Sequence, residues 1–253
     1  MTSALEIVVA ALFGAVLGSF LNVVAWRVPR GESIVRPRSS CPQCKAQIAG
    51  YDNVPVISWL LLRGRCRHCG MRIPIRYPAV ELLTAVVFAA IVAIRGFDDV
   101  LLLELPFAAV LIAVAAIDLE HRIVPNKILL PAAVWGLVVG AVVVPSHLPG
   151  LLIGGAAAFL GLLLAALAYP AGMGMGDVKL AGVMGLYLGA AVAPALLAAF
   201  ALGAFVGVMI MAREGTAARK RGVPFAPFLA LGGLVGLLAG PELVDLYTSH
   251  FLS

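Results

Sequence analysis

Long apolar runs dominate the hydrophobic pattern of the chain, and short polar segments separate them. A helix needs about 20 mainly apolar residues to cross a bilayer core, with a range of roughly 17–25. Eight runs reach or approach that length, and the sixth is short and contains glycines. They are residues 4–26, 78–94, 100–117, 128–144, 151–169, 178–192, 194–212 and 224–239. The pattern predicts an all-α polytopic membrane protein with about eight transmembrane helices.

The composition agrees with that interpretation. Of the 253 residues, 62% are hydrophobic and only 12% are charged, whereas a soluble domain is about half apolar and a quarter charged. No basic segment precedes the first run, which carries Glu6 near its start, and this favours an uncleaved membrane anchor over a secretory signal. The net charge of +5 indicates no nucleic-acid partner, because topology accounts for where the basic residues lie.

The distribution of lysine and arginine predicts the orientation. Every one of the 18 basic residues except Arg95 lies between residues 27 and 77, near Asp118, near Asp177, or between residues 213 and 222. With eight helices, these four segments fall on one face of the membrane. Basic segments stay in the cytoplasm, so we expect this face to be cytoplasmic, both termini to lie outside, and both aspartates to face the cytoplasm of a bacterial inner membrane.

Four cysteines form two C-x-x-C pairs within the long cytoplasmic segment, namely Cys41 with Cys44 and Cys66 with Cys69. Stable disulfides are unexpected in the reducing cytosol, and four thiolates form a closed, tetrahedral, structural Zn²⁺ site. The intervening residues 45–65 are slightly more than the roughly 15–20 usual for such ribbons. Four reduced cysteines without metal are the alternative, and a redox role is less favoured. We therefore divide the chain into a first transmembrane helix (1–27), a tetracysteine module (28–77) and a membrane core of about seven helices (78–253).

Two carboxylates are the candidate catalytic groups. Asp118 follows the third run, and Asp177 follows a segment with three glycines in five residues. An ionisable group at the edge of the hydrocarbon is a functional-site hypothesis. In a partly dry site the pair would share one proton, so that one carboxylate deprotonates water and the other donates to a carbonyl. Alternatively, Asp118 is an interfacial cap and Asp177 is stabilised by a helix dipole.

Smaller features leave further alternatives. The glycines before Asp177 lack Cβ and would give backbone close access to the acid. Glu81 is either part of an interfacial ion pair or a contact for a substrate or methyl donor. Asn22 is expected to make an interhelical hydrogen bond, and Lys179 is either a topogenic charge or a group that orients Asp177.

Five motifs, in order along the chain, resemble the type IV prepilin peptidases, which are GxGD-type membrane aspartic proteases. They are Gly-Ser-Phe-Leu-Asn-Val-Val (18–24), the paired C-x-x-C, Arg-Tyr-Pro-Ala-Val-Glu-Leu (76–82), an Asp-Leu motif ending in Val-Pro-Asn (118–126), and Gly-Met-Gly-Asp-Val-Lys-Leu (174–180). The resemblance maps the family's catalytic aspartates onto Asp118 and Asp177. Two positions depart from the family pattern: Ala226 stands where glycine is usual, and Asn126 stands where aspartate is common.

The resemblance implies a function. Such enzymes cleave the leader peptides of prepilins and pseudopilins, and many then methylate the new N-terminal residue with S-adenosylmethionine. The sequence identifies no residues that bind this methyl donor. Prepilins and the lipid bilayer are the expected partners. A peptidase without methyltransferase activity, a transporter with acidic ion-coupling sites and a membrane assembly subunit are the alternatives.

Overall fold

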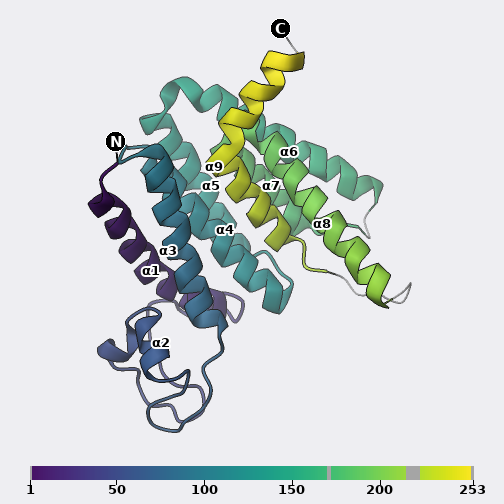
Figure 1. Ribbon diagram of the computed structural model, residues 1–253. Coiled ribbons are helices and arrows are strands. Elements are labelled where there is room, and N and C mark those ends of the chain that lie inside the picture. Colours follow the sequence, from purple (N-terminus) through teal and green to yellow (C-terminus); the bar gives the residue numbers. More distant parts are fainter. Residues whose placement is uncertain (1, 170–171, 215–222, 252–253) are drawn as a thin grey trace. The chain divides into compact units, whose positions relative to one another are not determined.

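Helices make up the regular structure of the computed structural model, which describes residues 2–169, 172–214 and 223–251 (Figure 1). Two isolated antiparallel bridges within the cysteine segment are the β-structure among these residues. The elements are α1 (Ala4–Arg27), η1 (Gly50–Asn53), α2 (Ile57–Leu61), α3 (Arg76–Arg95), α4 (Leu101–His121), α5 (Asn126–Val143), η2 (Pro145–His147), α6 (Leu148–Ala168), α7 (Met175–Leu188), η3 (Gly189–Ala191), α8 (Val192–Glu214) and α9 (Ala226–Phe251).

The predicted all-α membrane fold is confirmed, because a long helix lies over each of the eight apolar runs. Seven segments of the described residues are long and apolar enough to cross a bilayer, and one of these, Met175–Arg213, contains both α7 and α8. The chain turns between these two helices at Gly189, where φ is +55°. The basic residues Arg219, Lys220 and Arg221, used above to predict orientation, lie outside the described residues.

Several helices extend past the apolar runs that predicted them. The third run ends at residue 117, but α4 continues to His121 and includes Asp118. The sixth run begins at residue 178, but α7 begins at Met175 and includes Asp177. Hydropathy marks the part of a helix that lies in hydrocarbon, whereas backbone hydrogen bonds continue into the polar region. Both acids therefore lie in terminal helical turns and not in loops.

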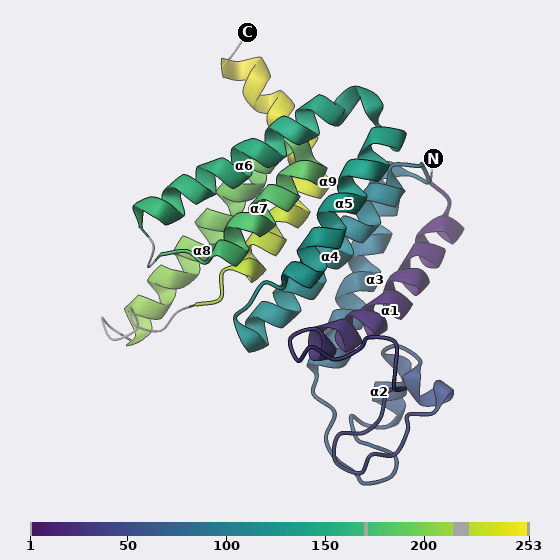
Figure 2. The same ribbon diagram turned by 180° about the vertical axis from the view of Figure 1, so that it is seen from behind.

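The chain forms two compact units, residues 1–101 and 102–253. In the first unit, α1 and α3 pack along one another (Figure 2). A Cβ on Gly18 would lie 2.7 Å from the Cα of Glu81, and one on Gly14 would lie 2.7 Å from the carbonyl oxygen of Thr84. Small residues four apart allow this close helix contact in a membrane.

In the second unit, α4 is the most deeply buried of the membrane spans. Phe107, Leu111 and Ile117 on this helix have no exposed surface. Helix α6 packs along α7 and α8 packs along α9, and Gly233 of α9 lies against Leu111. Phe107 also stacks on Tyr187 of α7, with the ring centroids 4.6 Å apart, so α4 packs against both α7 and α9.

Candidate active site and metal centre

Asp118 is turned into the second unit and not toward water. Only 5% of the surface of Asp118 is exposed. Its Oδ2 accepts a hydrogen bond of 3.1 Å from the backbone N–H of Ala226. Ala226 begins α9, whose first N–H groups have no partner within the helix. The partial positive charge of a helix N-terminus attracts a carboxylate. The cation of Arg122, one turn further along the chain, also interacts with Asp118.

Asp177 is half-buried in the first turn of α7. Its backbone N–H donates to the carbonyl oxygen of Gly174 at 3.0 Å. A Cβ on Gly174 would lie 3.5 Å from Asp177 Oδ2, which is ordinary van der Waals contact. The space left by the missing Cβ of Gly174 is therefore next to the carboxylate, as the sequence indicates. A larger residue would also fit at this position, because its Cβ would make only an ordinary contact.

The tighter packing occurs at Gly176. A Cβ on Gly176 would lie only 2.8 Å from the Cβ of Val124, in the connection between α4 and α5. Three residues further along α7, Lys179 Nζ donates a hydrogen bond of 3.1 Å to Asn126 Oδ1. These two contacts join the start of α7 to the segment that directly follows Asp118.

The two aspartates consequently lie at the same end of the second unit. Asp118 comes from the end of α4 and Asp177 from the start of α7. Such an arrangement can hold a water molecule and a carbonyl group between a proton acceptor and a proton donor. No feature of the sequence signals the contribution of the Ala226 N–H, because a backbone donor depends only on where α9 begins.

The four cysteine sulfurs form a second cluster, in the first unit. All four lie within 4.8 Å of one another, and the sulfurs of Cys41 and Cys69 are 3.7 Å apart. Four thiolates about 2.3 Å from a tetrahedral zinc ion would be separated by about 3.8 Å. The cluster therefore fits a tetrahedrally coordinated metal ion, with one ligand from each cysteine.

Both C-x-x-C pairs adopt the same backbone turn. The N–H of Lys45 donates to Cys41 O at 2.9 Å, and the N–H of Gly70 donates to Cys66 O at 3.0 Å. Both donor residues have positive φ, +61° at Lys45 and +71° at Gly70. An antiparallel bridge flanks each turn, Ser40 with Gln47 and Arg65 with Arg72. The two halves of the site are thus structural repeats that the sequence shows only as paired cysteines.

Backbone amides prepare the first cysteine of each pair to bind a cation. Hydrogen bonds from the N–H groups of Cys44 and Gln43 lower the pKa of the Cys41 thiol to about 6. The N–H groups of Cys69 and His68 lower the pKa of the Cys66 thiol in the same way. The thiolate is the form that binds metal, so each turn favours the form of its first cysteine that a metal requires.

Other contacts brace this module. Arg67, between the cysteines of the second pair, donates from Nε to Asp52 Oδ2 at 2.8 Å, and its hydrogen bond lowers the pKa of that carboxyl. The indole N–H of Trp59, on α2, donates to Ile73 O at 3.1 Å. The short elements between the cysteine pairs are therefore tied to the second pair.

The fold and these residues define a class: a polytopic helical membrane protein with a tetracysteine module able to hold a metal and two carboxylates at the same end of a separate helical unit. The family model described as the bacterial peptidase A24 N-terminal domain matches residues 12–95. The model described as the type IV leader peptidase family matches residues 105–208. The chain belongs to the type IV leader peptidase family, as its motifs suggested.

Curated relatives extend the similarity over nearly the whole chain. A protein of Bacillus subtilis named prepilin leader peptidase/N-methyltransferase is 36% identical over 93% of this chain and 95% of its own length. A protein of the same name from Aeromonas hydrophila is 34% identical over 95% of this chain and 93% of its own. A protein of the same name from Myxococcus xanthus is 38% identical over 81% of this chain and 63% of its own length. No solved structure gives a significant match.

Proposed function

We propose that the protein is an aspartic endopeptidase that removes leader peptides from prepilins or pseudopilins, with Asp118 and Asp177 as its catalytic pair. The close contact between Gly176 and Val124, which brings the start of α7 to the segment that follows Asp118, is the observation that carries the proposal. Membership of the leader peptidase family and the names of the relatives support the substrate class.

The two aspartates divide the work of hydrolysis. The carboxylate that is ionised takes a proton from a water molecule, and the oxygen of that water attacks the scissile carbonyl carbon. The carboxyl that is protonated donates to the carbonyl oxygen and so stabilises the tetrahedral intermediate. A proton then passes to the leaving amine as the peptide bond breaks. The Ala226 N–H, which donates to Asp118 Oδ2, holds this carboxylate in place throughout.

The orientation of the chain favours cleavage at the cytoplasmic face. The basic residues cluster in the segments that follow α1, α4, α6 and α8, which is the distribution of cytoplasmic segments. We assign the bacterial inner membrane as the location on this basis. The apolar helix of a prepilin would lie in the bilayer, and its leader would meet the aspartates from the cytoplasm.

A second activity, methylation of the new N-terminal amine, is favoured by the names of the relatives, which join peptidase and N-methyltransferase. The N-terminal family match over residues 12–95 covers the tetracysteine module and the paired helices α1 and α3. We assign methyl transfer from S-adenosylmethionine to this first unit. The predicted division into a first helix (1–27), a tetracysteine module (28–77) and a membrane peptidase core (78–253) differs from this assignment in the placement of α3, and it remains a prediction.

The metal that fits the four cysteines is zinc, in a structural role. Cys41, Cys44, Cys66 and Cys69 would fill all four positions, which leaves no position for a reacting water. Zinc would supply cross-linking to a segment with few apolar residues, because small modules commonly need such a staple. It would supply none of the hydrolytic chemistry.

The peptidase assignment is tested by incubating a purified prepilin with wild-type protein, Asp118→Asn and Asp177→Asn in detergent. Asparagine keeps the shape of each side chain but cannot ionise. We expect each variant to lose cleavage by at least about 1,000-fold with an unchanged melting temperature within a few degrees. Normal cleavage by either variant would refute the catalytic pair.

A further inference from the structure

A buried polar cluster in the first unit has no part in the aspartate chemistry. Glu81, on α3, is only 8% exposed. Its Oε2 accepts a hydrogen bond of 2.7 Å from the backbone N–H of Val56, and α1 packs against its backbone, where a Cβ on Gly18 would lie 2.7 Å from the Cα of Glu81. Acidic side chains are rarely buried to this degree without a partner of opposite charge, so the cluster requires an explanation.

The segment that covers Glu81 is strained. Val56 has φ of +61°, a conformation that is a genuine outlier for a β-branched residue. Ser58, which is buried, holds the segment from both sides: its hydroxyl donates to Tyr51 O at 2.8 Å and accepts from Val54 N–H at 3.1 Å. Strained backbone kept in place by its surroundings is concentrated at binding and catalytic sites.

A second buried group beside Glu81 has unused capacity for hydrogen bonding. Asn22, 2% exposed, donates from Nδ2 to Tyr77 O at 3.0 Å, which is the interhelical bond that the sequence predicted. Its Oδ1 has no hydrogen-bond partner among the residues that the structure describes. Tyr77 lies one helical turn from Glu81 on α3. The cluster thus offers acceptors and a negative charge, which suits a cation with several N–H donors.

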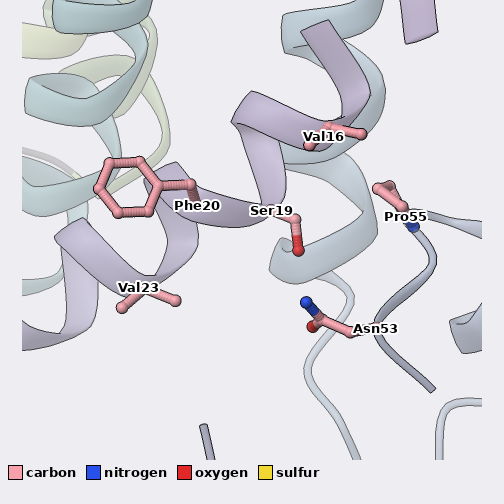
Figure 3. Close-up of a pocket in the computed structure, with 6 residues that line it drawn as sticks. All are labelled: Val16, Ser19, Phe20, Val23, Asn53 and Pro55. Atoms are coloured by element: carbon pink, nitrogen blue, oxygen red, sulfur yellow. The ribbon is translucent and has the colours of Figure 1, made fainter. Parts of the chain in front are cut away.

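A pocket of about 270 Å³ opens beside Ser19. Ser19 and Asn53 face one another across it, and the rest of the lining is apolar (Figure 3). The apolar residues are Val16, Phe20, Val23 and Pro55. Pro55 of the lining directly precedes Val56, whose N–H donates to Glu81, so the carboxylate lies next to the pocket. The volume is below the roughly 300–1,000 Å³ usual for drug-sized ligands, so it fits the end of a chain better than a nucleoside.

We propose that this pocket, lined by Ser19 and Asn53 and adjacent to Glu81, binds the N-terminal residue of the cleaved pilin and that Glu81 takes a proton from its α-ammonium group. The inference rests on the methyltransferase activity proposed above and names its amine-binding site. The apolar wall would hold the side chain of that residue, and the ammonium would lie against Ser19 and Glu81.

The chemistry balances with a sulfonium methyl donor as co-substrate. Glu81 removes one proton from the ammonium and so frees the nitrogen lone pair. The nitrogen attacks the methyl carbon, an N–C bond forms, and the C–S bond breaks with its electrons passing to sulfur. The products are a protonated secondary amine and a neutral thioether, and Glu81 later releases its proton to water.

The test separates cleavage from methylation in the full-length protein. Wild-type and Glu81→Gln proteins are incubated with a purified prepilin and with S-adenosylmethionine labelled in the methyl group. Cleavage is measured as a gel shift of the prepilin, and methylation as label incorporated into the pilin. Glutamine retains an oxygen that can accept from Val56. We expect cleavage within about 2-fold of wild type and methylation reduced by at least about 10-fold. The variant should behave in the same way with a pre-cleaved pilin peptide, whose free amine bypasses the aspartates.

Two further variants exclude a merely structural effect. Thr84→Val alters a buried polar side chain one turn further along α3, whose hydroxyl bonds only to Val80 O within that helix, and should preserve both activities. Asn53→Trp places a large side chain on an exposed residue and should fill the pocket, raising the KM for the pilin peptide but not for S-adenosylmethionine. A raised KM for the methyl donor alone would mean that the pocket binds the donor's ammonium group, which would overturn the proposal.

The outcomes distinguish this inference from the function on which it rests. Wild-type protein that cleaves without methylating would refute the methyltransferase activity itself and the inference with it. Wild-type protein that methylates, together with Glu81→Gln that methylates equally well, would refute only the role of Glu81. Equal losses of cleavage and methylation in Glu81→Gln would assign Glu81 to folding.

Discussion

Gly176 and Val124 pack so closely that a Cβ on the glycine would lie 2.8 Å from the Cβ of the valine. Val124 belongs to the segment that follows Asp118, and Gly176 directly precedes Asp177. The contact therefore sets how near the start of α7 can come to the end of α4. This contact explains sterically why the residue at position 176, the second glycine of the Gly-Met-Gly-Asp motif, has no side chain. Its small size controls the separation of the two aspartates.

Substitution of Gly176 by alanine should reduce cleavage by about 10- to 100-fold, because a displacement of reacting groups by even about 1 Å can have that effect. The measurement is the rate of prepilin cleavage at saturating substrate. Gly161→Ala is a matched control in α6, since nothing lies within 4 Å of a Cβ at that glycine, and its activity should be unchanged.

The same contact offers a rescue. Val124→Gly removes the Cβ that the new Cβ would meet at 2.8 Å, so the double variant Gly176→Ala/Val124→Gly should recover much of the lost rate. Interaction between neighbouring residues appears as non-additivity of this kind. Strictly additive losses would show that Gly176 is needed for another reason, such as backbone conformation.

Removal of the Ala226 N–H should weaken the enzyme by misplacing Asp118. Ala226→Pro deletes this donor at the first position of a helix, where proline is best tolerated. Hydrogen bonds to charged groups contribute about 1.5–3 kcal/mol, which corresponds to roughly a 10- to 150-fold lower kcat.

Ala226→Gly is the control, because it retains the N–H and restores the residue that resembles the family pattern. It should cleave prepilin about as well as wild type. Thermal unfolding of both variants reports any loss of packing, since Ala226 is fully buried. A proline variant with normal kcat and a normal melting temperature would contradict a role for this hydrogen bond.

Removal of metal should unfold the tetracysteine module. Elemental analysis of purified protein should find about one zinc per chain, and Cys44→Ser should lower that value to near zero. The segment contains Arg63, Arg65, Arg67 and Arg72, so trypsin should cleave it rapidly in the variant or after chelation. Gln43→Ala changes the same turn without removing a ligand and should remain protected.

Metal binding should also depend on pH. The lowered pKa values of the Cys41 and Cys66 thiols mean that these two sulfurs are ionised more readily than an ordinary cysteine. As pH falls through the pKa of Cys41, near 6, protons compete with the metal and zinc should be lost more easily. Zinc retention that did not change between pH 8 and pH 5 would argue against thiolate ligands.

Much of the fold could be predicted because the bilayer imposes a simple rule on sequence. Runs of apolar residues located the long helices, and the C-x-x-C spacing located a metal-binding cluster. The ends of α4 and α7 were predicted less well, because hydropathy does not report where backbone hydrogen bonds stop. As a result, Asp118 and Asp177 were expected just outside the helices that contain them.

The pairing of the aspartates was harder to predict from the residues themselves. It depends on contacts between distant segments, Val124 with Gly176 and Asn126 with Lys179, and neither pair carries a local signal. The hydrogen bond of Lys179 to Asn126 ties the start of α7 to α5, while the choice between a topogenic charge and a group that orients Asp177 stays a prediction. The positive φ of Val56 and its hydrogen bond to Glu81 could not be predicted from the sequence, since valine is normally avoided at positive φ.

Helix α7 has 14 residues and so rises about 21 Å, whereas the hydrocarbon core is about 30 Å thick. It is therefore shorter than one full crossing. The turn at its end, Gly189, is buried and lies against Gly150 and Leu151 in the first turn of α6. Non-helical backbone at membrane depth has to be covered by protein, and the start of α6 provides that cover on one side of Gly189.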